Sequence, residues 1–121
     1  MDETQKAKPY NLEERTFEFA QDVREFVGKL PKIVANIEDG RQLIRSSGSV
    51  GANYIEASES LSKKDFYLRI KICRKEAKES RYWLKLINTG GNTDLKKESS
   101  YLADEATEFM KIFGSIITRG S

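Results

Sequence analysis

The most constraining feature of this chain is the spacing of its apolar and small residues. After residue 10 they recur at alternating steps of four and three, and the first series is Leu12, Thr16, Phe19, Val23, Phe26 and Leu30. Three similar series follow through the rest of the chain, and the first of these is Ile33, Ile37, Gly40, Ile44, Ser47, Gly51, Tyr54, Ser58 and Leu61. This register is the seam pattern of helices that pack at small crossing angles. It predicts helices over about residues 11–29, 32–60, 63–89 and 93–118.

The ends of these segments carry helix-boundary signals. Side chains able to accept hydrogen bonds from first-turn N–H groups stand at three expected starts: Asn11 with Glu14, Ser62 with Asp65, and Asn92 or Thr93. Pro31 suits the first turn of the second helix. Gly90-Gly91 can supply the left-handed residue that ends the third. Short connections make neighbouring helices antiparallel, so we expect an all-α, up-down-up-down four-helix bundle. One domain would span residues 11–118, after a flexible segment at 1–10.

Composition excludes most catalytic chemistry. The chain of 121 residues has no histidine, which removes histidine-based catalysis, catalytic triads and imidazole metal sites. Cys73 is the single cysteine, so neither an intrachain disulfide nor a four-cysteine zinc site can form, and it is expected to be a small buried residue. No signal peptide or apolar run of membrane-spanning length is present. We therefore expect a cytoplasmic, non-enzymatic protein without cofactor, metal or membrane.

The middle of the second segment, residues 45–52 (RSSGSVGA), is rich in poor helix formers. The unbroken register across it favours a continuous helix over a loop. Its small residues would let another helix approach closely, either inside the bundle or in a partner chain. The small positions are Gly40, Ser47, Gly48, Gly51 and Ala52.

A polar ladder runs beside the seam of the second segment, and a matching stripe of the third segment carries two carboxylates. The candidate residues of this polar network or interface are Gln42, Arg45, Ser49, Asn53, Glu56, Glu76, Glu79 and Trp83. A carboxylate near a helix seam needs a cation or several hydrogen-bond donors, and an arginine can bind it through two parallel hydrogen bonds. Three interpretations remain open: a structural network that fixes helix register, a subunit interface, and a catalytic site. We expect Arg45, Asn53, Glu56 and Glu79 to form one buried or interfacial network.

The net charge of +2 conceals a local excess. Residues 63–89 hold nine Lys or Arg and three Asp or Glu, a balance of +6, whereas the segments before and after sum to −3 and −1. Basic residues with interleaved tyrosines suit phosphate neutralisation and base stacking. The alternative is a solvated face, with or without pairing to the acidic first helix. The candidate nucleic-acid-binding residues are Lys64, Tyr67, Lys71, Arg74, Lys75, Lys78, Tyr82 and Lys85.

The stretch from Gln42 to Ile87 resembles the bacterial proteins named for 23S rRNA intervening sequences, which are sometimes labelled ribosomal proteins. The matching positions are Gln42, Arg45-Ser46, Ser49-Val50, Asn53, Glu56, Ser62, Phe66, Lys75-Glu76-Ala77 and Glu79-Ser80-Arg81-Tyr82-Trp83-Leu84. Family members often have Thr at the place of Ser80, and Ile55-Glu56-Ala57 departs slightly from their commoner Ala-Glu-Gly.

The resemblance implies a fold and an assembly more than an activity. It implies an antiparallel four-helix bundle that associates as a homopentamer around a central channel. A related group, the accessory proteins of diversity-generating retroelements, uses a basic pentamer to engage nucleic acid and a reverse transcriptase. No enzymatic activity and no catalytic residues are defined for the family. We therefore expect a homo-oligomer that binds RNA or DNA, or alternatively an adaptor that holds a protein partner without nucleic acid.

Overall fold

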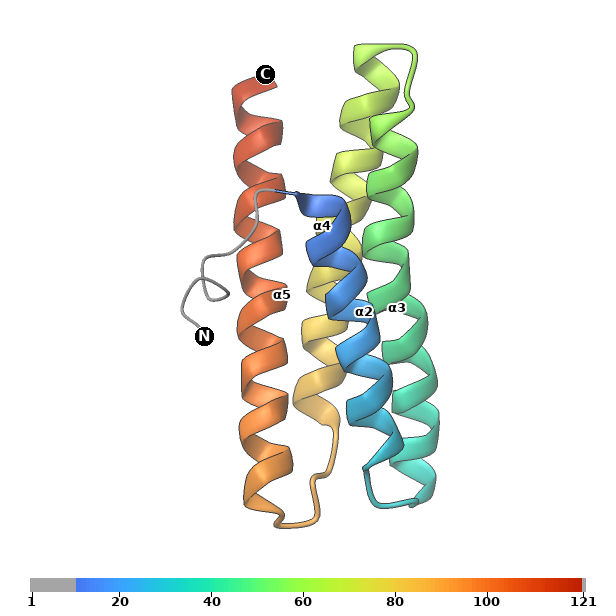
Figure 1. The fold of residues 1–121 in the computed structure, drawn as a ribbon, viewed down its shortest axis with the longest axis vertical. Helices are drawn as coiled ribbons and strands as arrows, with labels where there is room; N and C mark the ends of the chain where they lie inside the picture. The colour runs from blue at the N-terminus through green and yellow to red at the C-terminus, as the bar shows by residue number, and fades with distance from the viewer. Residues whose placement is uncertain (1–10, 121) are drawn as a thin grey trace.

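Four helices account for nearly all of residues 11–120, the part of the chain that the computed structural model describes. They are α2 (Leu12–Gly28), α3 (Val34–Ser58), α4 (Lys63–Leu86) and α5 (Thr93–Gly120), and no strand occurs between residues 11 and 120 (Figure 1). The predicted all-α bundle is confirmed, with boundaries displaced by three residues or fewer. The expectation of a flexible segment at 1–10 lies outside the described residues.

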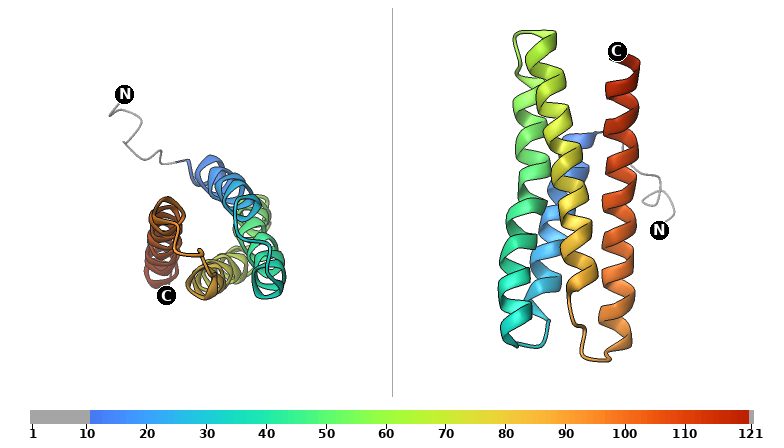
Figure 2. Two further views of the ribbon diagram at one scale, coloured as in Figure 1. Left: turned by 90° about the horizontal axis from the view of Figure 1, so that it is seen from below. Right: turned by 180° about the vertical axis from the view of Figure 1, so that it is seen from behind.

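Each helix packs against the two that flank it around the bundle. α3 contacts α2 and α4, α5 contacts α4 and α2, and no contact joins α2 to α4. The end-on view of Figure 2 shows α2 and α4 diagonally opposite each other. α2 is also the shortest helix, so the α3–α4 hairpin and the end of α5 extend beyond its first turn (Figure 1). The arrangement places whatever α2 and α4 display on different sides of the molecule.

The core follows the predicted seam in α2, α4 and α5. In α3 the prediction is wrong in part, because Leu43, Val50 and Ala57 are the buried apolar residues while Ile33, Ile37 and Leu61 of the predicted series are exposed. Phe19 of α2 and Phe109 of α5 meet edge to face with ring centroids 5.4 Å apart, and Phe109 stacks on Phe113. Val50, Ile70 and other apolar seam residues of the remaining helices are fully buried. Burial of a large apolar side chain contributes roughly 1.5–3 kcal/mol, so this continuous seam is the main source of stability.

The predicted caps are confirmed at three helix starts. The side chains of Asn11, Ser62 and Asn92 each accept a hydrogen bond from a backbone N–H three residues later, at 3.0 or 3.1 Å. Two boundary predictions are wrong. Pro31 precedes α3, which begins at Val34, and Gly90 and Gly91 follow the end of α4 by several residues. Both glycines adopt left-handed φ values of 67° and 78°, so they form the turn into α5 instead of capping α4.

Asn36 explains why the chain before α3 stays non-helical. Its buried side chain donates to the carbonyl oxygens of Pro31 (3.0 Å) and Asn88 (2.8 Å) and accepts from the Asn88 N–H (3.0 Å). One amide therefore holds the α2–α3 loop against the α4–α5 loop. The sequence reasoning missed this contact, because nothing in the seam register distinguishes Asn36 from a surface residue.

The small residues of α3 serve close packing inside the bundle. The helix continues unbroken through residues 45–52, as predicted. A Cβ atom at Gly40 would lie 2.9 Å from a methyl of Val27, and one at Gly51 would lie 2.9 Å from Oγ1 of Thr16. Glycine at these two positions lets α2 approach α3 more closely than any side chain would allow. Ala52, in contrast, is exposed on the outside of the same contact.

Candidate functional site

The predicted basic residues form an exposed face on α4. Among the candidate basic residues, five are exposed and make no ion pair with the described residues: Lys64, Lys71, Arg74, Lys78 and Lys85. Tyr82 is exposed beside them and packs edge to face on Trp83, with ring centroids 5.0 Å apart. Tyr67 is half-buried against Phe66 and the end of α5, so its ring is less available for stacking.

This basic face lies on the side of α4 that borders α5. The Arg74 side chain passes Gly114 of α5, and Arg81 donates to Thr107 of α5 at 3.1 Å. Lys71, Lys78 and Lys85 follow at steps of three and four, which keeps them on that side of the helix. The alternative in which the acidic first helix pairs with this face is wrong, because α2 lies diagonally opposite α4 and does not contact it. The basic face therefore keeps an uncompensated positive charge.

Lys75 departs from the other candidate basic residues. Its Nζ lies 3.8 Å from Oε2 of Glu76, although its side chain is largely exposed. It therefore belongs with the polar network.

The centre of the polar network is the pair formed by Arg45 of α3 and Glu79 of α4. Nη2 of Arg45 lies 2.9 Å from Oε2 of Glu79 and 3.5 Å from Oε1 of Glu76. Nε1 of Trp83 donates to the same Glu79 oxygen at 3.4 Å. The predicted binding of an arginine to these carboxylates is confirmed, and the Trp83 ring lies beside the ion pair.

The remaining predicted network residues do not join this centre. Arg69 donates to Asn53 at 3.0 Å in a separate contact, whose arginine the sequence reasoning missed. Ser49 donates to a backbone carbonyl of α3, while Gln42 and Glu56 are exposed and bond no other network residue. The prediction of one connected network is wrong within a single chain. Arg45 and Glu56 are eleven residues apart, about 16 Å along a helix, so their side chains cannot meet.

The electrostatics of the Arg45–Glu79 pair keep both groups charged. Partial burial tends to raise the pKa of Glu79, but hydrogen bonds from Arg45 and Trp83 outweigh it and hold that pKa below its ordinary value. The hydrogen bond to Glu79 likewise raises the pKa of Arg45. A general acid at neutral pH needs a raised carboxyl pKa, so Glu79 is poorly suited to that role.

Glu76 is the unusual member of the network. Its side chain is only 9% exposed, and Oε1 has no hydrogen bond although Arg45 lies 3.5 Å away. Beneath it, Ser46 and Ser80 share a buried hydrogen bond of 2.8 Å. A buried carboxylate oxygen without a hydrogen-bond donor is costly, and the positive charge of Arg45 at 3.5 Å offsets part of that cost.

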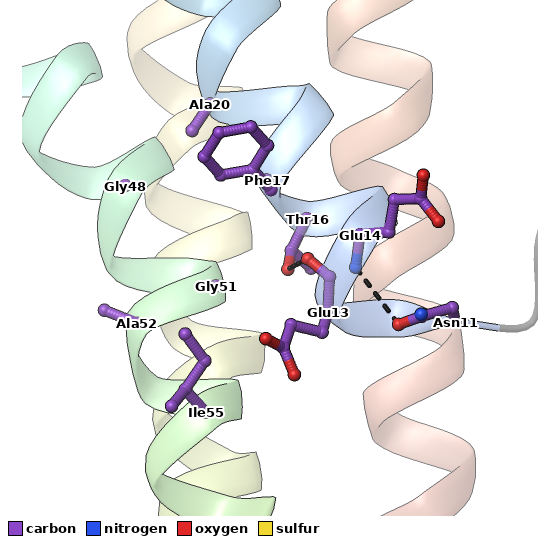
Figure 3. A pocket seen from close by; sticks show the side chains of 10 residues that line it. All are labelled: Asn11, Glu13, Glu14, Thr16, Phe17, Ala20, Gly48, Gly51, Ala52 and Ile55. Atoms are coloured by element: carbon purple, nitrogen blue, oxygen red, sulfur yellow. Dashed lines mark hydrogen bonds between the residues drawn. The ribbon is translucent and has the colours of Figure 1, made fainter.

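A groove between α2 and α3 is the main concave feature that the sequence reasoning missed. It is lined by small residues, Ala20 of α2 and Gly48, Gly51 and Ala52 of α3. The larger side chains of Phe17 and Ile55 lie beside them (Figure 3). Its volume is about 570 Å³. The exposed apolar residues lie off the 4-3 seam, and that is the signal that could have located the groove.

Other chemistry is not assembled in the described chain. No group of three or more carboxylate or thiol side chains between residues 11 and 120 is arranged to hold a metal ion. Cys73 is fully buried, as predicted, and burial raises the pKa of its thiol to about 12. No helix of residues 11–120 combines the length and apolarity needed to cross a bilayer.

The fold and these surfaces define an antiparallel four-helix bundle whose charged and apolar faces are kept apart. The chain belongs to the 23S rRNA-intervening sequence protein family, whose model matches residues 9–115. It is also similar to a crystal structure of a protein of unknown function from the S23 ribosomal protein family of Bacteroides thetaiotaomicron VPI-5482. The two chains are 33% identical with a TM-score of 0.70, over 87% of this chain and 96% of the other. No curated protein matches the chain.

Proposed function

We propose that this protein is a non-enzymatic, homo-oligomeric RNA-binding bundle, and that the basic face of α4 contacts the RNA. The observation that carries the proposal is the set of exposed cations Lys64, Lys71, Arg74, Lys78 and Lys85, which make no ion pair with the described residues. Such charges attract phosphates strongly and release their counterions on binding. Tyr82 offers an exposed ring on which an unpaired base can stack.

Oligomerisation strengthens this proposal. One face presents few phosphate contacts, and several copies of it on a ring raise the effective concentration of binding sites along one RNA strand. The family resemblance implies such a ring, a homopentamer.

The non-enzymatic part rests on the state of the carboxylates. Arg45 holds Glu79 in its ionised form, and Glu76 is nearly buried below it. Neither carboxylate is placed to exchange a proton with an exposed substrate. Replacing both with glutamine should alter stability or assembly, and any change in RNA affinity should follow the change in assembly.

The RNA proposal is tested by charge reversal. The triple variant Lys71→Glu, Arg74→Glu and Lys78→Glu changes the charge by six, and a matched control makes the same change at exposed Lys96, Lys97 and Lys111 of α5. Anisotropy of a labelled single-stranded RNA should show at least a hundredfold loss of affinity for the first variant and a small loss for the control. Equal losses would indicate a nonspecific charge effect, and unchanged affinity would refute the proposal.

Salt dependence gives an independent measurement. If several α4 cations contact phosphates, the affinity of the wild-type protein falls steeply and linearly on a logarithmic scale as salt rises. The triple variant should show a shallower slope than the control.

An adaptor role is the second candidate, and the exposed apolar residues favour it. Phe17, Ile55, Leu68 and Leu86 are all exposed on the described surface, and clusters of such residues mark contacts with proteins more often than with nucleic acids. An absorbance ratio at 260 and 280 nm typical of pure protein after purification at low salt, together with a stoichiometric co-purifying protein, would favour this role over RNA binding.

A further inference from the structure

A crevice runs along the outside of the bundle between α2 and α3, and it contains two hollows. The first is the groove of Figure 3, of about 570 Å³, and the second, of about 370 Å³, lies between the end of α2 and the first half of α3. Residues at steps of three, four or seven line both hollows, which places the hollows on the same side of each helix. They are Phe17, Ala20 and Val27 of α2 and Ile37, Ile44, Gly48, Ala52 and Ile55 of α3.

α3 carries two apolar stripes, and only one of them faces the core. Leu43, Val50 and Ala57 are buried in the bundle. The second stripe lines the crevice, where Ile37 is 49% exposed and Ile55 is 46% exposed. A helix that packs on one side only needs a single stripe, and a stripe with spacing of three and four is the surface that another helix covers. The second stripe therefore points to a further helix that packs on α2 and α3 from outside.

The length of the crevice sets the length of such a helix. Ile37 and Ile55 are 18 residues apart in α3, which is about 27 Å along a helix axis, so a helix of about 18 residues would cover the crevice. The exposed Arg24 lies beside Gly48, between the two hollows, and supplies a cation at the middle. Grooves of this kind bind the apolar face of an amphipathic helix.

The two ends of the crevice carry opposite charges. Glu13 and Glu14 line the end near the start of α2, and Lys32 and Arg41 line the other end. Lys32 makes no ion pair with a described residue, and Arg41 has one exposed contact of 3.9 Å with Glu38, a kind of pair that contributes little. A helix with basic residues at one end and acidic residues at the other would complement both ends.

A second copy of this chain lacks a surface of this shape. Among the described residues, the large apolar side chains that α4 and α5 expose are Leu68, Tyr82, Leu86 and Tyr101. Leu68 and Tyr82 are separated by about four helical turns, so they form no continuous stripe. Two crevices placed face to face would leave both pairs of hollows unfilled, in contrast to the close packing of protein contacts. The shape thus favours a helix of a different protein.

We propose that the crevice binds an amphipathic helix of another protein, with basic residues over Glu13 and Glu14 and acidic residues over Lys32 and Arg41. The inference names the partner class for the adaptor role, the second candidate function above. It does not depend on RNA binding, because the crevice lies on α2 and α3 whereas the basic face lies on α4. One molecule can therefore hold both ligands.

The experiment uses three labelled peptides of about 18 residues that share one apolar face of leucines. The first has acidic residues in its first turn and basic residues in its last turn, the second is basic at both ends, and the third is acidic at both ends. Fluorescence anisotropy should show that the wild-type protein binds the first peptide at least tenfold more tightly than the other two. Lys32→Glu with Arg41→Glu makes both ends of the crevice acidic, so this variant should prefer the second peptide. Failure of the first peptide to bind, or the same order of affinities in the variant, would overturn the proposal.

A matched pair of neutral substitutions tests the position of the site. Ala52→Gln places a larger side chain in the crevice, and Ala35→Gln makes the same change at an exposed position of α3 that lines neither hollow. Ala52→Gln should weaken binding of the first peptide at least tenfold, and Ala35→Gln should leave it unchanged; equal affinities would overturn the proposal.

The mass of the protein distinguishes a different partner from a second copy. Light scattering after size exclusion should give both variants the wild-type mass, and a lower mass for Ala52→Gln alone would show that a second copy covers the crevice and would overturn the proposal. RNA affinity should be the same in both variants. A wild-type protein that binds the first peptide but no RNA would refute the proposed RNA-binding function and leave this inference supported.

Discussion

Arg15 of α2 and Glu105 of α5 form a buried, two-bond ion pair across the bundle. Nε of Arg15 lies 2.8 Å from Oε2 of Glu105, and Nη2 donates to Oε1 at 3.1 Å. The guanidinium also lies over the ring of Phe109, 5.1 Å from its centroid. The hydrogen bond that Arg15 donates to Glu105 more than offsets burial and raises the pKa of Arg15.

Removing one member of this pair should destabilise the protein strongly. We expect Arg15→Met or Glu105→Leu alone to lower the free energy of unfolding by about 3–5 kcal/mol, because each leaves a buried charge without its partner. The double variant should recover most of that loss. Urea denaturation of the three variants checks this, and an additive double variant would contradict it.

Alanine substitution at two helical glycines should change the stability of the protein in opposite directions, because only Gly51 lies at the close approach of α2 to α3. Gly51→Ala should destabilise by about 1–3 kcal/mol, since its Cβ would lie 2.9 Å from Oγ1 of Thr16. Gly114→Ala, within α5 and with only ordinary contacts 3.9 Å away, should stabilise by up to about 1 kcal/mol through helix propensity. Thermal denaturation distinguishes the two, and equal shifts would show that the contact at Gly51 relaxes freely.

Asp22, on the exposed side of the acidic helix, has a raised carboxyl pKa. Partial desolvation is the largest cause, followed by the nearby carboxylates Glu25 and Glu18. A carboxyl group whose pKa is raised by folding destabilises the folded state when it is ionised. Asp22→Asn should therefore increase stability at pH 7 by a few tenths of a kcal/mol, within the range of surface substitutions of about 0.5 kcal/mol. The gain should shrink toward pH 4, and an unchanged gain at low pH would contradict the cause.

The pH dependence of stability should be flat near neutrality. With no histidine, and with Cys73 held at a pKa of about 12, no side chain titrates between about pH 6 and 8 at ordinary values. Glu79 has a lowered pKa in the folded state, so its contribution is present above its unfolded pKa and is lost as pH falls through the folded value. The stability difference between wild type and Glu79→Gln should thus decline below about pH 4.5. Chemical denaturation at a series of pH values measures it, and a constant difference would exclude this linkage.

Much of the fold could be predicted from sequence because the seam register is repeated in every helix. Asn11, Ser62 and Asn92 set three helix starts through local hydrogen bonds, which depend on neighbours in the chain. Pro31 and Gly90 were misplaced because Asn36 links two distant loops, and no local pattern encodes that contact.

The candidate site was predictable only in part. The ion pair of Arg45 with Glu79 was predictable because the two residues lie on facing stripes of adjacent helices. The extent of the network was not, because Glu56 lies too far from Arg45 along the axis of α3 for their side chains to meet. Arg15 and Glu105 flank the seam with opposite charges, a signal that would have suggested their pair. The groove depends on how closely α2 approaches α3, and Gly40 and Gly51 fix that distance only after folding.

The diagonal placement of acidic α2 and basic α4 makes the molecule a transverse electric dipole despite its net charge of only +2. The Debye length is roughly 30 Å in 10 mM salt, so free molecules should attract one another over that distance, positive side to negative side. Near 1 M salt the Debye length falls to about 3 Å, and this attraction is screened. The solubility of the protein should therefore be lowest in dilute buffer and should rise as salt is added.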